Sequence, residues 1–118
     1  MKSGIVLIAH GSPDPQWARP FERIAARLAE KLPAVSIGLA YLEHGPSLEE
    51  SVAALVAKGV AAIRVVPLFL GAGGHVKEDL PRLVSNSGRA GLSLTLESPI
   101  GERAEVIDAI ARAISAAR

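Results

Sequence analysis

Strand-like and helix-like segments alternate four times along this chain, and this alternation restricts the possible folds more than any other feature. Continuous or period-two apolar patterns predict strands in residues 5–9, 35–41, 63–70 and 92–96. Apolar residues with helical spacing follow each strand and predict helices in residues 21–32, 48–56, 80–84 and 106–114. Four such units predict a single α/β domain over residues 1–118, with a parallel sheet, right-handed crossovers and helices on both faces in three α/β/α layers.

The strand patterns also predict the order of the sheet. Residues 5–9 and 63–70 are almost continuously apolar, which is typical of central strands that are buried on both faces. The other two strands alternate apolar residues with polar or small ones, so we expect them at the edges. The resulting order, 2-1-3-4, is that of a small flavodoxin-like sheet. Ligands of such sheets bind at the carboxyl ends of the strands, beside the switch point between strands one and three.

Two of the helices carry more specific expectations. In the third, we expect Pro81 in the first turn with Asp79 as cap, because proline has no amide hydrogen to donate. Residues 75–78 would then form a separate turn before that helix. In the fourth helix, four apolar side chains share one face and are expected to point inward onto the sheet: Val106, Ile107, Ile110 and Ile114.

Composition excludes several classes of function. The 13 Lys and Arg residues nearly balance the 12 Asp and Glu residues, and no basic tail stands out, so we expect neither nucleic acid nor a membrane surface as a partner. Cysteine is absent, which excludes thiolate metal sites and cysteine nucleophiles and fits a cytoplasmic protein. The apolar run near the N-terminus is too short to span a membrane and lacks a small-residue cleavage site, so we expect no signal peptide.

All three histidines fall at or just after the carboxyl end of a predicted strand. His10 and His75 would flank the switch point, and Glu43 would approach from the neighbouring strand, beside His44. Two imidazoles and one carboxylate suit a borderline divalent ion such as cobalt, nickel, iron or zinc. We therefore predict that His10, Glu43 and His75 contact a metal, with an open coordination position through which the metal is handed on.

Ordinary structural roles stay open for the same residues. A histidine at a strand end usually bonds to backbone, His44 lies in a turn before a helix, and Glu43 would be a normal exposed acid. The loop of residues 71–74 would serve as a plain connection, although Gly73 and Gly74 also permit close approach of the backbone to a flat ligand.

Several familiar catalytic motifs are absent. The chain has no G-x-S-x-G elbow, which argues against an α/β-hydrolase, and neither a P-loop nor a G-x-G-x-x-G loop. Histidine phosphatases also have a His-Gly pair after a strand, but they have Arg immediately before the histidine, where this chain has Ala9.

Three stretches of the sequence match a known family. They are Leu-Ile-Ala-His-Gly-Ser at residues 7–12, Ala-Tyr-Leu-Glu at 40–43 with Pro-Ser-Leu at 46–48, and Val-Val-Pro-Leu-Phe-Leu at 65–70 with Gly-Gly-His at 73–75 and Asp-Leu-Pro at 79–81. In these stretches the chain resembles the small, single-domain CbiX-type sirohydrochlorin chelatases of the class II chelatase group. The resemblance covers almost the whole chain, and the third stretch is the most specific.

The resemblance implies a function and a set of residues. The family's metal-contacting histidines fall on His10 and His75, which would also be catalytic, and its acidic residue falls on Glu43. The implied reaction is insertion of a divalent metal, cobalt first and nickel or iron as alternatives, into sirohydrochlorin or a close tetrapyrrole relative. The metal is a substrate, no organic cofactor is needed, and a homodimer is expected because family members pair two such domains around one cleft.

Further residues are expected near the tetrapyrrole. Ser12, Gly73, Gly74 and His44 would contact it, and its carboxylates would meet basic residues, for which the candidates are Arg19, Lys77 and Arg82. Two positions depart from the family pattern, namely Pro13, where many relatives have Arg, and His44, where an apolar residue is usual. Two other functions stay open: a metal or tetrapyrrole carrier without turnover, and a phosphate-handling enzyme that uses His10 as nucleophile.

Overall fold

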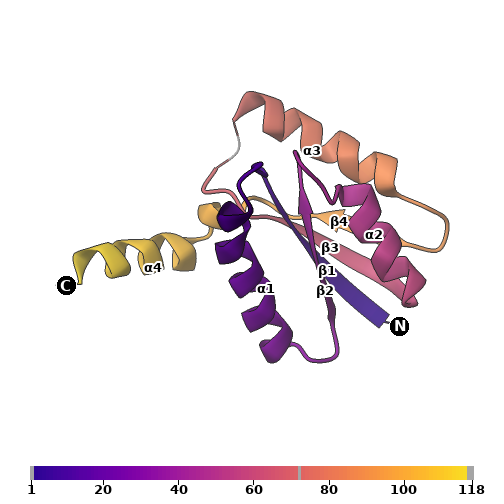
Figure 1. The fold of residues 1–118 in the computed structure, drawn as a ribbon, viewed down its shortest axis with the longest axis horizontal. Helices are drawn as coiled ribbons and strands as arrows, with labels where there is room; N and C mark the ends of the chain where they lie inside the picture. Colours follow the sequence, from indigo (N-terminus) through magenta and orange to yellow (C-terminus); the bar gives the residue numbers. More distant parts are fainter. Residues whose placement is uncertain (1, 72, 117–118) are drawn as a thin grey trace.

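A four-stranded parallel sheet forms the centre of the molecule, which we describe from a computed structural model over residues 2–71 and 73–116 (Figure 1). The strand order β2-β1-β3-β4 confirms the predicted order. In register, Ile5 of β1 lies between Ile37 of β2 and Arg64 of β3. The strands are β1 (Lys2–Ala9), β2 (Ser36–Tyr41), β3 (Val60–Pro67) and β4 (Ser93–Leu96).

A helix follows each strand, as the alternation predicts. The four helices are α1 (Arg19–Lys31), α2 (Leu48–Ala57), α3 (Gly74–Ser87) and α4 (Ala104–Ser115), and short 3-10 turns η1 (Pro15–Ala18) and η2 (Ile100–Glu102) precede α1 and α4. A capping box starts α2, where the Ser47 hydroxyl accepts from the Glu50 amide and the Glu50 carboxylate accepts from the Ser47 amide. No helix within the described residues has the length and apolar composition needed to cross a bilayer.

The two faces of the sheet are covered unequally. Helices α2 and α3 pack on one face, where Val6 and Ile8 of β1 join Val52 and Val65 in the larger core cluster. The opposite face carries Ile5, Leu7 and Val66, and α1 packs against part of it through Leu28 and Leu32. Helices pack on both faces of the sheet at β1, which explains why the sequence of this strand is apolar without interruption.

The start of α3 differs from the prediction. The helix begins at Gly74 and runs through Pro81, so Asp79 does not cap it and residues 75–78 are part of its first turns. Pro81 removes one helical hydrogen bond, to the carbonyl of Lys77. The helix continues because it buries an apolar stripe that begins before the proline, at Val76 and Leu80, and continues with Leu83 and Val84. Burial of that stripe outweighs the loss of one hydrogen bond.

The direction of α4 also differs from the prediction. The helix leaves the sheet and projects into solvent (Figure 1), so its apolar face does not point inward within this chain. Ile107 is 53% exposed and Ile114 is 78% exposed. The radius of gyration is 14.7 Å, whereas a compact chain of this length is expected to have about 13.5 Å. Within the described residues, α1 is therefore the only helix that packs on its face of the sheet.

Glu97, just after β4, ties the start of α4 to the sheet. Its carboxylate binds Arg64 of β3 and, at 2.6 Å, Arg103. The hydrogen bond from Arg64 is the main cause that holds the pKa of Glu97 below its ordinary value, although partial burial acts in the opposite direction. A carboxylate whose pKa is lower in the folded state stabilises the fold above its unfolded pKa. This contribution is lost as the pH falls through the folded pKa.

We expect Glu97→Gln to lower the free energy of unfolding by about 1 kcal/mol at neutral pH. The difference from the parent protein should shrink below the ordinary glutamate pKa of 4.5 and vanish in stronger acid. Urea titrations at neutral pH and at several acidic pH values measure this difference. Glu102→Gln removes a charge from the neighbouring turn η2 and serves as control. A Glu97→Gln effect that is the same at every pH would contradict the ion-pair explanation.

Candidate active site

The exits of β1 and β2 are joined by backbone hydrogen bonds. The Leu42 amide donates to the Ala9 carbonyl at 3.0 Å, and the Glu43 amide donates to the His10 carbonyl at 2.9 Å. The next residue, Gly11, has φ +100°, and a Cβ built there would collide with the Glu43 carbonyl group, whose carbon lies 2.9 Å away. The loop after β1 therefore requires glycine at this position, and the backbone places His10 beside Glu43.

The His10 and Glu43 side chains form a pair that is open to solvent. The His10 Nδ1 atom lies 3.2 Å from Glu43 Oε2, and the two side chains are 56% and 58% exposed. When the carboxylate accepts a hydrogen bond from Nδ1–H, the neutral imidazole carries its lone pair on Nε2. That nitrogen is then the group which accepts a proton or binds a metal, and Glu43 sets its orientation.

His75 lies apart from this pair in the folded chain. It is exposed in the first turn of α3, after Gly73 and Gly74, on the segment that follows the carboxyl end of β3. His10 follows β1 and His75 is on the segment after β3. Because β1 and β3 are paired parallel neighbours, both segments leave the sheet at the same edge. No group of three or more His, Asp or Glu side chains within residues 2–71 and 73–116 is placed to hold one ion. The three-residue metal set of His10, Glu43 and His75 stays a prediction.

A hollow of about 400 Å³ opens beside Glu43. Its lining includes two residues that the sequence predicted near the tetrapyrrole, Ser12 and His44. Ser12 accepts a hydrogen bond from the Asp14 amide, and His44 has a left-handed backbone with φ +62°. These two side chains therefore share one surface with Glu43.

Aromatic residues in the wall of this hollow were missed by the sequence analysis. Trp17 and Tyr41 line it, and Phe21 packs against both rings with centroids 4.6 Å from Trp17 and 6.5 Å from Tyr41. Burial raises the pKa of the Tyr41 hydroxyl, and the charge of Glu22 adds to this. Asp14 followed by Pro15 is a sequence signal for the start of a helical turn. Asp14 caps the turn η1, which carries Trp17, and its carboxylate accepts from the Gln16 amide.

The remaining predicted residues lie on exposed surface. Side chains built on Gly73 or Gly74 would meet no atom within 4 Å, so the backbone there is accessible to a ligand. Arg19 and Lys77 are exposed, and Arg82 pairs with Asp79 one turn away on α3. Arg82 is therefore partly neutralised, whereas the described contacts engage neither Arg19 nor Lys77 in an ion pair.

A family model described as CbiX matches residues 4–117. A sirohydrochlorin cobaltochelatase from Methanosarcina acetivorans is 36% identical over 85 residues, which make up 71% of this chain and 65% of that relative. The matched region thus spans slightly less than two thirds of that relative's length.

Two solved structures share the fold. A protein from Marinobacter aquaeolei assigned to cobalamin biosynthesis as CbiX superposes with a TM-score of 0.82 and 35% identity, covering 95% of this chain and 93% of the other. The sirohydrochlorin chelatase SirB from Bacillus subtilis, in complex with cobalt, superposes with a TM-score of 0.76 and 25% identity over 97% of this chain and 50% of SirB. Together with the family match across residues 4–117, these similarities confirm the resemblance noted in the sequence: this chain belongs to the CbiX family.

Proposed function

We propose that this protein is a metal chelatase that inserts a divalent metal, cobalt first, into sirohydrochlorin. The single observation that carries the proposal is the exposed His10–Glu43 pair at the carboxyl ends of β1 and β2, the edge of the sheet at which parallel sheets of this kind bind ligands. The names of the relative from Methanosarcina acetivorans and of the cobalt-bound SirB support the same substrate and metal.

The proposed mechanism begins with proton transfer. Metal insertion requires the loss of two pyrrole protons, and a neutral imidazole accepts a proton near neutral pH. His10 would accept one through Nε2 while Glu43 holds its other nitrogen and stabilises the imidazolium that forms. His75 would act as the second base or as a transient metal ligand.

The macrocycle would lie over the edge of the sheet where these side chains emerge. Gly73 and Gly74 allow a flat ring to approach the backbone, and the hollow lined by Ser12 and His44 would take part of its periphery. Arg19 and Lys77 are exposed cations for the carboxylates of the ring. In this scheme the metal is a substrate, which fits a donor pair that is exposed rather than enclosed.

A second copy of the chain would complete the cleft. SirB aligns with nearly all of this chain but over only half of its own length, so one copy corresponds to half of a larger chelatase. A homodimer would bring two such edges together around one macrocycle. The absence of cysteine agrees with a cytoplasmic enzyme, which we include in the proposal.

Absorbance during incubation with sirohydrochlorin and Co²⁺ tests the proposed activity. We expect the spectrum of the metallated product to appear faster than in a control without protein, and parallel runs with Fe²⁺ and Ni²⁺ would rank the metals. Equilibrium binding of Co²⁺ and of sirohydrochlorin is measured alongside. Binding of either molecule without acceleration of insertion would contradict the enzyme and favour a carrier.

A further inference from the structure

Three of the four aromatic residues of the chain gather beside the His10–Glu43 pair. The sequence contains one Trp, one Tyr and two Phe residues. Trp17 and Tyr41 line the hollow of about 400 Å³ that opens beside Glu43, and Phe21 packs against both rings. We call Trp17 and Tyr41 the aromatic wall. In a chain with only 3% aromatic residues, their concentration at one hollow indicates a local task.

The aromatic wall does not contribute to the core of the domain. Of the described residues in the two core clusters, none is Trp17, Tyr41 or Phe21, and all three side chains remain partly exposed. Aromatic side chains contribute large contact areas when they are buried. A Trp and a Tyr that stay partly open at the ligand-binding edge of a sheet therefore present their rings to a molecule outside the fold.

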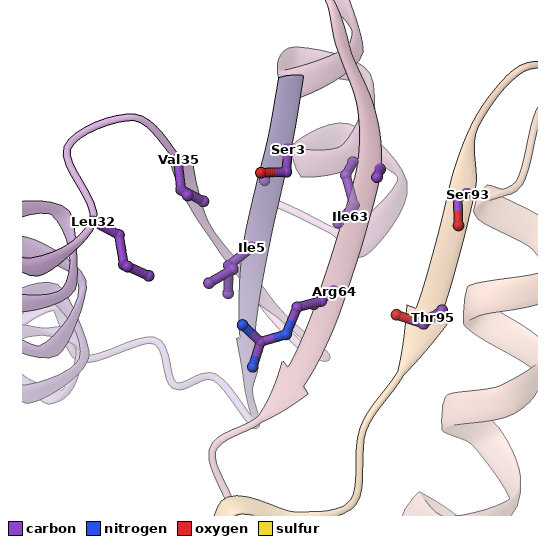
Figure 2. A pocket seen from close by; sticks show the side chains of 10 residues that line it. Ser3, Ile5, Leu32, Val35, Ile63, Arg64, Ser93 and Thr95 are labelled. Carbon is purple, nitrogen blue, oxygen red and sulfur yellow. The ribbon is translucent and has the colours of Figure 1, made fainter. Parts of the chain in front are cut away.

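A second hollow shows that such a wall is not a general feature of this sheet. It has a volume of about 290 Å³, and the side chains of Ile5, Leu32 and Arg64 line it across from β4 (Figure 2). Its lining includes residues 3–5 at the start of β1, whereas His10 follows the other end of that strand. No aromatic residue is among the described residues that line it. The aromatic wall thus belongs to the hollow at the carboxyl edge.

Backbone contacts hold the aromatic wall in place. Trp17 lies in the turn η1, where its amide donates to the Asp14 carbonyl at 3.0 Å. Tyr41 ends β2, pairs with Ala9 in the sheet and donates its amide to the Pro46 carbonyl at 2.9 Å. The two ring centroids are 6.1 Å apart and the ring planes are inclined by 59°. A flat ligand that stacks on one ring therefore meets the other at an angle, and both arrangements are favourable between aromatic systems.

The charges around the hollow select the part of a tetrapyrrole that can enter it. Asp14 and Glu43 contribute carboxylates to the lining, and apart from the imidazole of His44 the described lining residues include no basic side chain. The two acids would repel a carboxylate substituent of the ring. An uncharged edge of the conjugated ring would instead bury its surface against the aromatic wall. The exposed Arg19 follows η1 outside the lining, so a ring carboxylate that pairs with it stays outside the hollow.

We infer that Trp17 is a positioning residue for the macrocycle, and that the aromatic wall holds one uncharged edge of the ring while the ring carboxylates stay outside the hollow. Glu43 lines the same hollow and contacts His10, so an edge that rests on the wall fixes the ring relative to the proposed proton acceptor. The inference rests on the proposed chelatase function, because it takes a tetrapyrrole as the ligand.

Equilibrium titration with sirohydrochlorin tests the role of Trp17. We expect Trp17→Ala to weaken binding at least about 10-fold, and Trp17→Phe, which keeps an aromatic face, to stay within about 3-fold of the parent protein. Gln16→Ala is the matched control, because Gln16 is exposed in the same turn and is not among the lining residues. Unchanged binding by Trp17→Ala, or an equal loss in Trp17→Phe or in Gln16→Ala, would overturn the inference.

Asp14→Asn tests the exclusion of carboxylates from the hollow. Asn caps a helical turn as well as Asp does, so η1 is retained while the lining loses one negative charge. If the ring carboxylates stay outside, sirohydrochlorin should bind within about 2-fold of the parent affinity, because distant charges are screened by salt. Binding that is tighter by about 10-fold or more would mean that a carboxylate enters the hollow, and it would overturn this arrangement.

Rates of cobalt insertion separate positioning from proton transfer. We expect Trp17→Ala to raise KM by the factor seen in binding and to keep kcat close to the parent value, because the lost contact is made in the bound substrate as well as in the transition state. A fall in kcat with unchanged KM would overturn the positioning role.

The titrations do not depend on turnover, so the two proposals fail separately. A parent protein that binds sirohydrochlorin without inserting metal would contradict the proposed function, and the binding of the Trp17 variants would still decide the inference. A parent protein that inserts metal, with unchanged binding in Trp17→Ala, would refute the inference alone. A parent protein that does not bind sirohydrochlorin would refute both.

Discussion

His10→Ala is expected to abolish catalysed metal insertion while leaving the fold intact. The side chain is 56% exposed and its polar contacts are with Glu43 and the Gly11 carbonyl. Removing an exposed side chain of this kind changes the free energy of unfolding by no more than about 0.5 kcal/mol. Loss of a positioned proton acceptor typically lowers a rate by about 100- to 10,000-fold. Initial rates of cobalt insertion, together with a thermal melt of the same sample, measure both quantities.

A pair of glutamate variants shows whether the effect belongs to the His10–Glu43 pair. Glu43→Gln keeps an oxygen that accepts from His10 Nδ1–H but loses the charge that stabilises the imidazolium, so we expect a decrease of about 10-fold. Glu49→Gln changes an exposed carboxylate in the first turn of α2, outside the proposed site, and should retain the parent rate. If the His10→Ala variant inserts cobalt at the parent rate, His10 is not the base, and this holds whether or not the protein is a chelatase.

Most of the sheet could be predicted because burial dictates its sequence. β1 is apolar at successive positions since helices pack on both of its faces. β4 alternates because Leu94 and Leu96 contact the larger core cluster, whereas Ser93 and Thr95 line a hollow on the opposite face of the sheet. The proximity of His10 and Glu43 followed from the same reasoning, because neighbouring parallel strands end at the same edge.

The errors arose where local signals and tertiary contacts disagree. Pro81 is a local helix-start signal, but the apolar stripe of α3 begins before it at Val76, so the helix starts earlier and includes His75. The apolar face of α4 predicted a helix packed inward, which was wrong, because the helix projects from the sheet and its isoleucines are exposed. Helical spacing of apolar residues predicts that a helix has an apolar face, but it does not predict where the connection before the helix directs that face.

Gly11→Ala is expected to damage both the fold and the site. Alanine at φ +100° is strained by about 1–3 kcal/mol. In addition, its Cβ would press against the Glu43 carbonyl group, which cannot rotate away because it is backbone. Together these effects should lower the free energy of unfolding by about 3 kcal/mol, which corresponds to a melting temperature roughly 10–15 °C lower. Calorimetry measures the change in stability, and the cobalt assay measures the loss of activity.

Two other glycines separate the causes of this effect. Gly91 has φ +80° but no atom within 4 Å of a built Cβ, so Gly91→Ala introduces the backbone strain without the collision. Gly71 has neither a positive φ nor a close neighbour, and Gly71→Ala should leave the melting temperature unchanged. If contact with Glu43 matters, Gly11→Ala must be less stable than Gly91→Ala and must alone disturb the His10–Glu43 pair. Equal melting temperatures for these two variants would mean that backbone strain alone explains why glycine is required at position 11. The close packing of the β1 and β2 exits would then not be what holds the His10–Glu43 pair in place.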